Sequence, residues 1–595
     1  MIQERLSKLR AEMQKRGITI YVVPTSDFHE SEYVGDHFKA RKYITGFTGS
    51  AGTAVVTMTE AGLWTDGRYF VQAAKQLEGT SVTLYRMGEE GVPTVEEFVE
   101  KALEEGGCIG FDGRVVNDAW GKEFAQIAEQ KKASLYVTED LVDIIWTDRP
   151  ALPHEPVYLL DEKYTGRSVA DKLQAVRKEM EKAGAKLHLI SSLYDIAWLL
   201  NVRGNDISYV PVVLSYLAMT EDSCIWFVQD AALNDEVKAY LAANQIETRE
   251  YEDFYAYVEA IPAGTTILMN TSTVNYRVTG SIPKSCSIIN AVEPTTLMKA
   301  VKNDIEIENI KKAHVKDAVA MCKFMYWLKT NIGKIPMTEI SASDYLEELR
   351  RAQEGCVDLS FDTISGYAEH GAIVHYSATP ETDVELKPEG LLLVDSGGHY
   401  LEGTTDITRT FALGPLTYDM KHDFTLVCRS NLNLAAAKFA YGCCGQNLDY
   451  LARSPLWEEN KDYNHGTGHG VGYLLNVHEG PNSFHWRISK ARPAAVLEAG
   501  MITTDEPGIY IEGKYGIRTE NEMICRKGEK NAYGQFMYFE TITYVPIDLD
   551  ALLPEEMSVK ERQLLNDYHK MVYETVSPYL EGEELSWLET ATRAV

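Results

Sequence analysis

The segment that determines the fold reads LLLVDSGG at residues 391–398 and DITRTF at residues 406–411. The apolar run before Asp395 is typical of a buried strand, and the Ser-Gly-Gly after it indicates a turn. Asp406 opens a second strand. Because Asp395 and Asp406 are an odd number of positions apart, they cannot share one face of a continuous strand. We therefore predict a hairpin that brings the two aspartates together.

Three further residues that can bind metal ions lie in similar contexts. His469 lies in NHGTGHGVG at residues 464–472, where four glycines let the backbone approach a site closely. Glu506 follows the strand-like run MITTD and precedes Pro-Gly. Glu520 ends the run GIRTE, in which Arg518 and Glu520 point to the same side of a strand. Each side chain is thus presented at a strand end or a turn.

Gathered in one dry pocket, four carboxylates and one imidazole would be in electrostatic conflict. The like charges would raise pKa values until most carboxylates bound protons, unless cations were held between them. Two divalent ions remove this conflict. The set is rich in oxygen and has no thiolate, which favours Mn²⁺, although Co²⁺, Fe²⁺ or Zn²⁺ could bind the same residues. The five residues are Asp395, Asp406, His469, Glu506 and Glu520.

These segments, together with IVHY at residues 373–376 and NVHEGP at residues 476–481, resemble the catalytic domain of the pita-bread metallopeptidases. The resemblance is strongest to the Xaa-Pro aminopeptidases. It extends upstream through FTGSAG at 47–52, WTDGRY at 64–69 and AWLLNVRGND at 197–206, and so spans nearly the whole chain. The resemblance implies two related α/β creatinase-like domains, followed by an α+β pita-bread catalytic domain with a C-terminal helical extension.

The resemblance also implies a role for each metal ligand. Asp395 would bind one ion, His469 and Glu506 the other, and Asp406 and Glu520 would bridge both. A hydroxide held between the ions would attack the first peptide carbonyl, with Glu506 as general base.

Auxiliary residues follow from the same resemblance. His375, His465 and His478 would orient the carbonyl, shuttle protons and form the wall of the pocket, while Arg518 would act near the bridging glutamate. Local structural roles remain an alternative, because His465 and His478 flank glycine turns and Arg518 could serve only as a neutralising cation. Arg68 is a weaker candidate that could reach a neighbouring subunit.

Histidines concentrate in the part of the chain that carries these motifs. Eight of the fourteen lie between residues 370 and 485, and the sequence gives no role to four of them: His370, His399, His422 and His485. The other six are interpreted as surface or packing residues: His29, His37, His154, His188, His314 and His569.

Composition excludes several classes of protein. The net charge of −30 excludes a general binder of nucleic acids or anionic membranes, which needs surface lysine and arginine. Nine scattered cysteines, an odd number in a large chain, indicate a reduced, cytoplasmic setting. The charged N-terminus is not typical of a signal peptide, and no apolar run is long enough to span a membrane.

The chain is too long for one core, so we predict three domains. Residues 9–17 and 176–184 are similar in sequence, which indicates a duplication. The predicted domains are 1–153, its duplicate 154–295, and the catalytic domain 296–595 with a cap from about residue 547.

The resemblance implies a homodimeric enzyme that removes the first residue from peptides with proline at position two. The main alternative is a prolidase, which shares the catalytic domain but takes only dipeptides; two full N-terminal domains favour the aminopeptidase. A non-hydrolytic relative or a peptide-binding scaffold are further alternatives, although all five ligands are present. Motifs for a phosphate loop, a GxSxG serine nucleophile and an HExxH zinc site are absent from the sequence.

Overall fold

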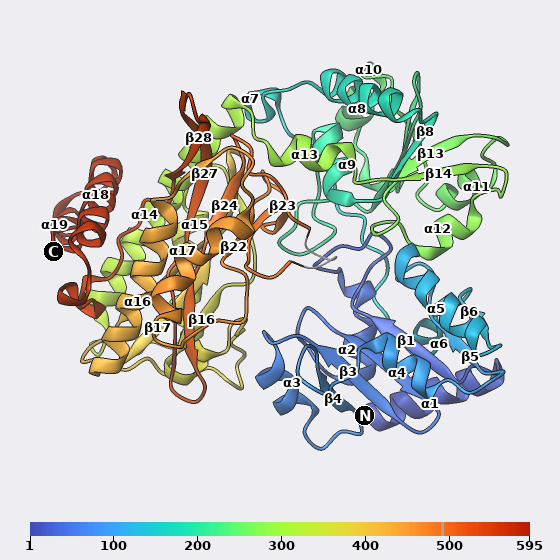
Figure 1. Ribbon diagram of the computed structural model, residues 1–595, viewed down its shortest axis with the longest axis horizontal. Helices are drawn as coiled ribbons and strands as arrows, with labels where there is room; N and C mark the ends of the chain where they lie inside the picture. Colours follow the sequence, from blue (N-terminus) through green and yellow to red (C-terminus); the bar gives the residue numbers. More distant parts are fainter. Residues whose placement is uncertain (489–492) are drawn as a thin grey trace. The chain divides into compact units, whose positions relative to one another are not determined.

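The computed structural model describes residues 1–488 and 493–595. Its contacts divide the chain into two compact units (Figure 1). The N-terminal unit comprises residues 1–161 and 167–295, and the C-terminal unit comprises residues 162–166 and 296–595. The finer division at residue 153 stays a prediction. None of the helices in the described part of the chain combines the length and apolarity needed to cross a membrane.

The N-terminal unit contains two six-stranded sheets with the same strand order. The first has the order β4-β3-β2-β1-β5-β6, and the second β12-β11-β10-β8-β13-β14. In the first sheet β2 pairs antiparallel with both β1 and β3, and in the second β10 pairs antiparallel with both β8 and β11. All remaining pairs in the two sheets are parallel. The short strand β9 belongs to neither sheet. The two related α/β folds predicted for this part of the chain are confirmed, and their origin by duplication stays a prediction.

The strands of these sheets are short and mostly buried. Those of the first sheet are β1 Ile20–Pro24, β2 Thr53–Thr57, β3 Ala61–Thr65, β4 Thr83–Arg86, β5 Cys108–Gly110 and β6 Ser134–Tyr136. Those of the second are β8 Leu187–Ile190, β10 Ser215–Met219, β11 Cys224–Val228, β12 Glu247–Arg249, β13 Thr266–Met269 and β14 Ser287–Asn290, and β9 is Val202–Arg203.

The repeated sequence segments lie in corresponding helices, α1 (Ile2–Lys15) and α8 (Val169–Ala183). Each helix buries apolar residues at a spacing of three or four, which places them on one helical face. They are Leu6, Leu9 and Met13 in α1, and Leu173, Val176 and Met180 in α8. A glycine with positive φ then ends each helix, at 69° for Gly17 and 72° for Gly184.

The C-terminal unit is built on antiparallel sheets covered by helices. A three-stranded sheet has the order β16-β17-β20, and a six-stranded sheet has the order β21-β28-β27-β24-β22-β23. The strands are β16 Ile364–Tyr367, β17 Leu391–Ser396, β20 Ile407–Ala412, β21 Lys438–Ala440, β22 Gly468–Gly470, β23 Glu479–Phe484, β24 Ile502–Asp505, β27 Asn521–Asn531 and β28 Gly534–Thr541. The predicted fold class is confirmed.

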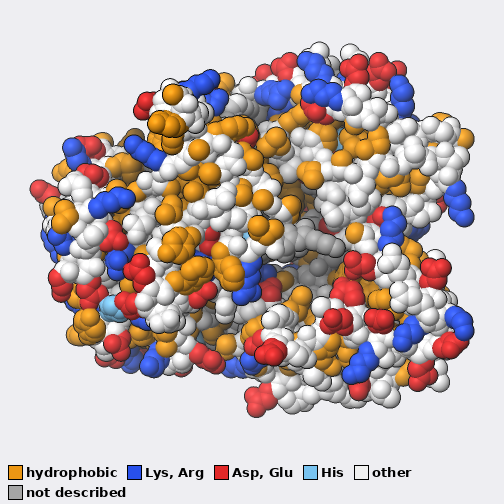
Figure 2. Space-filling model, in the orientation of Figure 1, with side chains coloured by type: hydrophobic (Ala, Val, Ile, Leu, Met, Phe, Trp, Pro, Cys, Tyr) orange, Lys and Arg blue, Asp and Glu red, His pale blue; other side chains and the backbone are white. Residues whose placement is uncertain are grey.

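The helices of this unit also pack against one another. Helix α14 (Asp304–Asn331) contacts α15 (Glu339–Arg351) and the C-terminal helices α18 (Val559–Val576) and α19 (Gly582–Ala591). Helices α16 (Tyr418–Ala435) and α17 (Gly445–Trp457) lie side by side (Figure 1). On the face seen in Figure 2, acidic and basic side chains lie interspersed.

Candidate metal centre

The hairpin predicted around the two aspartates is confirmed. Strands β17 and β20 pair in antiparallel register, with Asp395 opposite Thr408, and Asp406 immediately precedes β20. The turn lies at residues 401–402, after the short strand β18 (Gly398–Tyr400), and not at the predicted Ser-Gly-Gly. Gly397 instead lets the two arms of the hairpin approach closely, because a Cβ atom there would lie only 1.9 Å from the carbonyl oxygen of Thr405. Both carboxylates are therefore held by paired backbone.

The other three predicted ligands lie in or next to three adjacent strands of the six-stranded sheet, β22, β24 and β27. His469 is in β22, Glu506 follows β24, and Glu520 lies between β26 (Tyr515–Arg518) and β27. Strand β24 pairs with both β22 and β27, which brings the ends of these strands together. At Gly468 a Cβ atom would lie 1.8 Å from the carbonyl oxygen of Thr504, so the close approach of β22 to β24 requires glycine.

The ligand atoms of Asp406, His469 and Glu520 lie within 4.8 Å of one another. His469 Nε2 is 3.4 Å from Asp406 Oδ2 and 3.5 Å from Glu506 Oε1. Asp395 lies beside the same group: its Oδ2 accepts a hydrogen bond from Arg518 Nη2 at 2.6 Å, and its charge acts on Asp406. The structure thus brings all five residues into one cluster.

The electrostatics of the cluster match the conflict expected from its composition. Burial raises the pKa of Asp406 well above its ordinary value, and the charges of Asp395 and Glu506 add to the rise. The pKa of Glu520 is raised in the same direction by burial, then by Asp406 and Glu506. Burial also raises the pKa of Glu506, although His469 opposes the rise. The carboxylates need more positive charge than their protein neighbours supply.

The donor set fits divalent cations. Asp395 Oδ1 is buried and has no hydrogen-bond partner within the described residues. Arg518 supplies one permanent positive charge against four carboxylates. Carboxylate oxygens with one imidazole are ligands that Mn²⁺ and similar ions accept. Divalent ions would therefore both neutralise the cluster and satisfy the orphaned oxygen.

Three of the four predicted auxiliary residues contact this cluster, and the fourth, His375, follows an element that packs against two of its strands. His465 Nδ1 is 4.0 Å from Glu506 Oε2, and the ring of His478 lies 4.2 Å from the ring of His469 at an interplanar angle of 89°. Arg518 is fully buried beside Asp395. His375 follows the 3-10 helix η3 (Ala368–Ala372), which packs against β17 and β26.

Comparisons with known proteins give matches along nearly the whole chain. Models of the creatinase/prolidase N-terminal domain match residues 5–145 and 148–306, a model of metallopeptidase family M24 matches residues 308–527, and a model of the C-terminal region of that peptidase matches residues 535–595. Aminopeptidase P2 of Arabidopsis thaliana is 39% identical, with 100% of this chain and 88% of the relative covered. A probable Xaa-Pro aminopeptidase P of Sordaria macrospora is also 39% identical, with 98% of each chain covered.

The solved structure of X-prolyl aminopeptidase from Caenorhabditis elegans, described as a cytosolic enzyme with a di-nuclear active site, is 33% identical. It covers 100% of both chains with a TM-score of 0.95. The chain belongs to the Xaa-Pro aminopeptidases of metallopeptidase family M24. The predicted resemblance is confirmed, and with it a metal-dependent hydrolase.

In this M24 metallopeptidase, two residues of the site escaped the sequence analysis. Thr408 Oγ1 donates a hydrogen bond to Glu520 Oε2 at 2.6 Å. The Tyr510 hydroxyl lies 2.8 Å from His465 Nε2 and accepts a hydrogen bond from Arg518 Nη1 at 2.7 Å. A signal existed for Thr408, because strand alternation puts it on the same side as Asp406. The contact of Tyr510 with Arg518 is local, because both lie in the hairpin formed by β25 (Gly508–Ile511) and β26. Its contact with His465 spans 45 residues and had no signal in the sequence.

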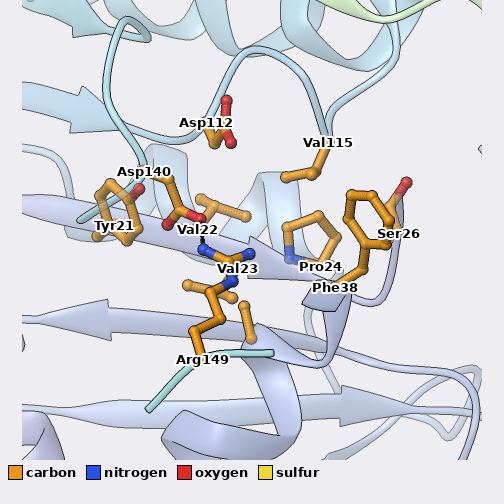
Figure 3. Close-up of a pocket in the computed structure, with 11 residues that line it drawn as sticks. Tyr21, Val22, Val23, Pro24, Ser26, Phe38, Asp112, Val115, Asp140 and Arg149 are labelled. Atoms are coloured by element: carbon orange, nitrogen blue, oxygen red, sulfur yellow. Dashed lines mark hydrogen bonds and ion pairs between the residues drawn. The ribbon is translucent and has the colours of Figure 1, made fainter. Parts of the chain in front are cut away.

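Two features of the N-terminal unit lie outside the metal centre. Arg68 forms an ion pair with Asp66 at 2.8 Å, and its reach to a neighbouring subunit stays a prediction. A cavity of about 20 Å³ is lined by Tyr21, Phe38 and other residues, and Figure 3 shows Asp140 and Arg149 pointing toward each other beside it. Such a volume holds about one water molecule, so it is too small for a peptide.

Proposed function

We propose that the chain removes the N-terminal residue from peptides whose second residue is proline. The observation that carries this proposal is the convergence of Asp406, His469 and Glu520 beside Glu506 and Asp395. It is supported by similarity over the full length to proteins named aminopeptidase P and Xaa-Pro aminopeptidase P. A prolidase, the alternative, shares the catalytic domain, but the matches to aminopeptidases over the whole chain favour the main proposal.

We propose the division of the ligands that the family resemblance implies. Asp395 would hold one ion, His469 and Glu506 the second, and Asp406 and Glu520 both. When bound, two divalent ions would polarise the scissile carbonyl and lower the pKa of a water molecule. We propose Mn²⁺ because the donors are mostly oxygen and include no thiolate.

The protein's own groups would position the peptide and move protons. Glu506, whose pKa is raised by burial, would accept the proton of the attacking water. His478, whose ring packs on that of His469, would return a proton to the proline nitrogen as it leaves. Arg518 would hold Tyr510 and Asp395 in place through two of its side-chain hydrogen bonds.

The chemistry of proline would let the site distinguish Xaa-Pro bonds from other peptide bonds. An Xaa-Pro bond has no amide N–H and its ring fixes φ, so a site that grips that N–H cannot use it. A pocket walled by His375, His465 and Tyr376 would accept the apolar ring by contact. Smaller or longer side chains at that position would fit less well.

We also propose three properties at the level of the whole protein. The domains would be 1–153, 154–295 and 296–595, which the separate matches at 5–145 and 148–306 support. The nine cysteines, all within the described residues, are free, which supports a cytoplasmic location. The family resemblance supports a homodimer.

The test is a peptide panel assayed with added Mn²⁺. Arg-Pro-Pro should be cleaved at its first bond, whereas Arg-Ala-Pro and Xaa-Pro dipeptides should be cleaved far more slowly. Equal rates on Arg-Pro-Pro and Arg-Ala-Pro would refute the proline rule. Activity on Xaa-Pro dipeptides alone would instead identify a prolidase.

A further inference from the structure

One buried carboxylate of the C-terminal unit lies outside the metal centre and accepts hydrogen bonds from three groups of one segment. Glu339, the first residue of α15, has 0% of its surface exposed. Its Oε1 accepts the backbone N–H of Tyr367 at 2.7 Å and lies 2.9 Å from His370 Nδ1. Its Oε2 accepts the hydroxyl of Tyr376 at 2.8 Å. One carboxylate thus satisfies three groups of a single segment, residues 367–376.

These three groups are distributed along the segment that leads to His375. Tyr367 ends β16, His370 lies within η3, and Tyr376 immediately follows His375. The rings of His370 and Tyr376 also pack together, with centroids 4.5 Å apart. Glu339 therefore fixes the segment at its beginning, its middle and its end.

The backbone of this segment needs such support. Ala368 has φ of 51°, in the left-handed region that residues other than glycine avoid unless their surroundings hold them there. The segment also packs backbone against backbone on β26, since a Cβ atom on Gly516 would lie 1.6 Å from the carbonyl oxygen of Gly371. Strand β26 carries Arg518, so the segment has little freedom to shift.

We propose that Glu339 is a positioning residue for His375, with His370 and Tyr376 as its side-chain donors. The role of His375 itself rests on the proposed function. His370, to which the sequence gives no role, donates its Nδ1–H in this arrangement. A carboxylate is required because all three partners are donors, whereas a glutamine would direct an N–H against one of them.

The test is a double-mutant cycle of Glu339→Gln and His375→Ala on Arg-Pro-Pro. Glu339→Gln should lower kcat/KM roughly 10- to 100-fold, as is typical for loss of a group that orients a functional residue. The double variant should be no slower than His375→Ala alone, because both changes remove the same function. Bound metal should be unchanged. Losses that multiply, or loss of metal, would overturn the proposal.

Glu347→Gln is the matched control, since Glu347 lies on the same helix with its side chain 33% exposed and pairs with Arg351. It should leave kcat/KM unchanged. If Glu339→Gln does not fold, Tyr376→Phe removes one donor and should show a smaller loss, again absent in the His375→Ala background. A Tyr376→Phe loss that persists in that background would overturn the proposal.

Hydrogen exchange of the metal-free protein separates this inference from the proposed function. Glu339→Gln should speed amide exchange across residues 367–376 and leave α16 protected. If the wild-type protein fails to cleave Arg-Pro-Pro, the proposed function is wrong, but the exchange result still tests the positioning. Unchanged exchange in residues 367–376 would overturn it.

Discussion

Two buried acidic sites in the C-terminal unit differ in how their charge is balanced. Asp317 on α14 accepts hydrogen bonds from Arg350 Nε at 2.8 Å, Arg350 Nη2 at 3.1 Å and the Tyr400 hydroxyl at 2.9 Å. In the metal centre, Asp406 and Glu520 instead lie among further carboxylates. Both sites are buried to a similar degree.

Their pKa values move in opposite directions. Burial alone would raise the pKa of Asp317, yet the charge and hydrogen bonds of Arg350 hold it below its ordinary value. Burial and neighbouring carboxylates raise the pKa of Asp406 and Glu520 well above theirs. The difference shows that charge balance, rather than burial, distinguishes a structural acid from a site that awaits cations.

The largest expected effect comes from removing a bridging carboxylate. Asp406→Ala should reduce activity to the level of the metal-free protein, because both proposed ions depend on this residue for charge and position. Metal content and hydrolysis of Arg-Pro-Pro measure the outcome. Chelation of the wild-type protein should have the same effect, and Mn²⁺ should restore it.

Asp317→Asn is the matched control for the same comparison. It should alter stability but keep both metal ions, because Asp317 is balanced by Arg350. Near-normal turnover by Asp406→Ala, or by a thoroughly demetallated sample, would rule out the two-metal proposal.

The next effect concerns His478, which contacts the ring of His469 but is not a proposed ligand. His478→Ala should keep the metal content and lower kcat by roughly 100- to 10,000-fold, the range for loss of acid–base help. Metal analysis and steady-state kinetics are the measurements. Loss of metal would make His478 a ligand, and an unchanged kcat would make it structural.

A smaller effect is expected when Arg350, which balances the charge of Asp317, is replaced. Arg350→Met leaves Asp317 buried without its cation, and should lower the free energy of unfolding by about 3–5 kcal/mol. Arg351→Met is the control, because its partially exposed ion pairs should contribute at most about 1 kcal/mol. Urea denaturation measures both. Equal losses in the two variants would contradict the distinction between the sites.

The two acidic sites also differ in how far the sequence could predict them. The ligands were predictable because Asp395 and Asp406 sit at the ends of recognisable strands and because four carboxylates imply cations. The contacts of Arg350 with Asp317, and of His370 with Glu339, depend on how helices and loops pack across many intervening residues. Nothing in the local pattern around His370 marks it as a partner of a buried acid.

The last expected effect is the pH dependence of stability in the metal-free protein. In the folded state the pKa values of Asp406 and Glu520 lie above their ordinary values of 3.8 and 4.5. At a pH between the unfolded-state pKa and the folded-state pKa of each group, the folded state therefore binds more protons than the unfolded state. Their contribution is fully present below the unfolded pKa and is lost as the pH rises toward the folded pKa. The slope is about 1.4 kcal/mol per pH unit for each proton.

Asp317 has the opposite sign, because its folded-state pKa is lowered, and its contribution is lost only as the pH falls below about 4. Urea denaturation of the chelated protein between pH 5 and 8 should therefore show stability falling as pH rises. Saturating Mn²⁺ should remove or reverse that slope, because the ions bind the deprotonated carboxylates. Asp406→Asn in the chelated protein should flatten it. A metal-free protein that grows more stable across this range would show that the cluster is already balanced by its own residues, as Asp317 is.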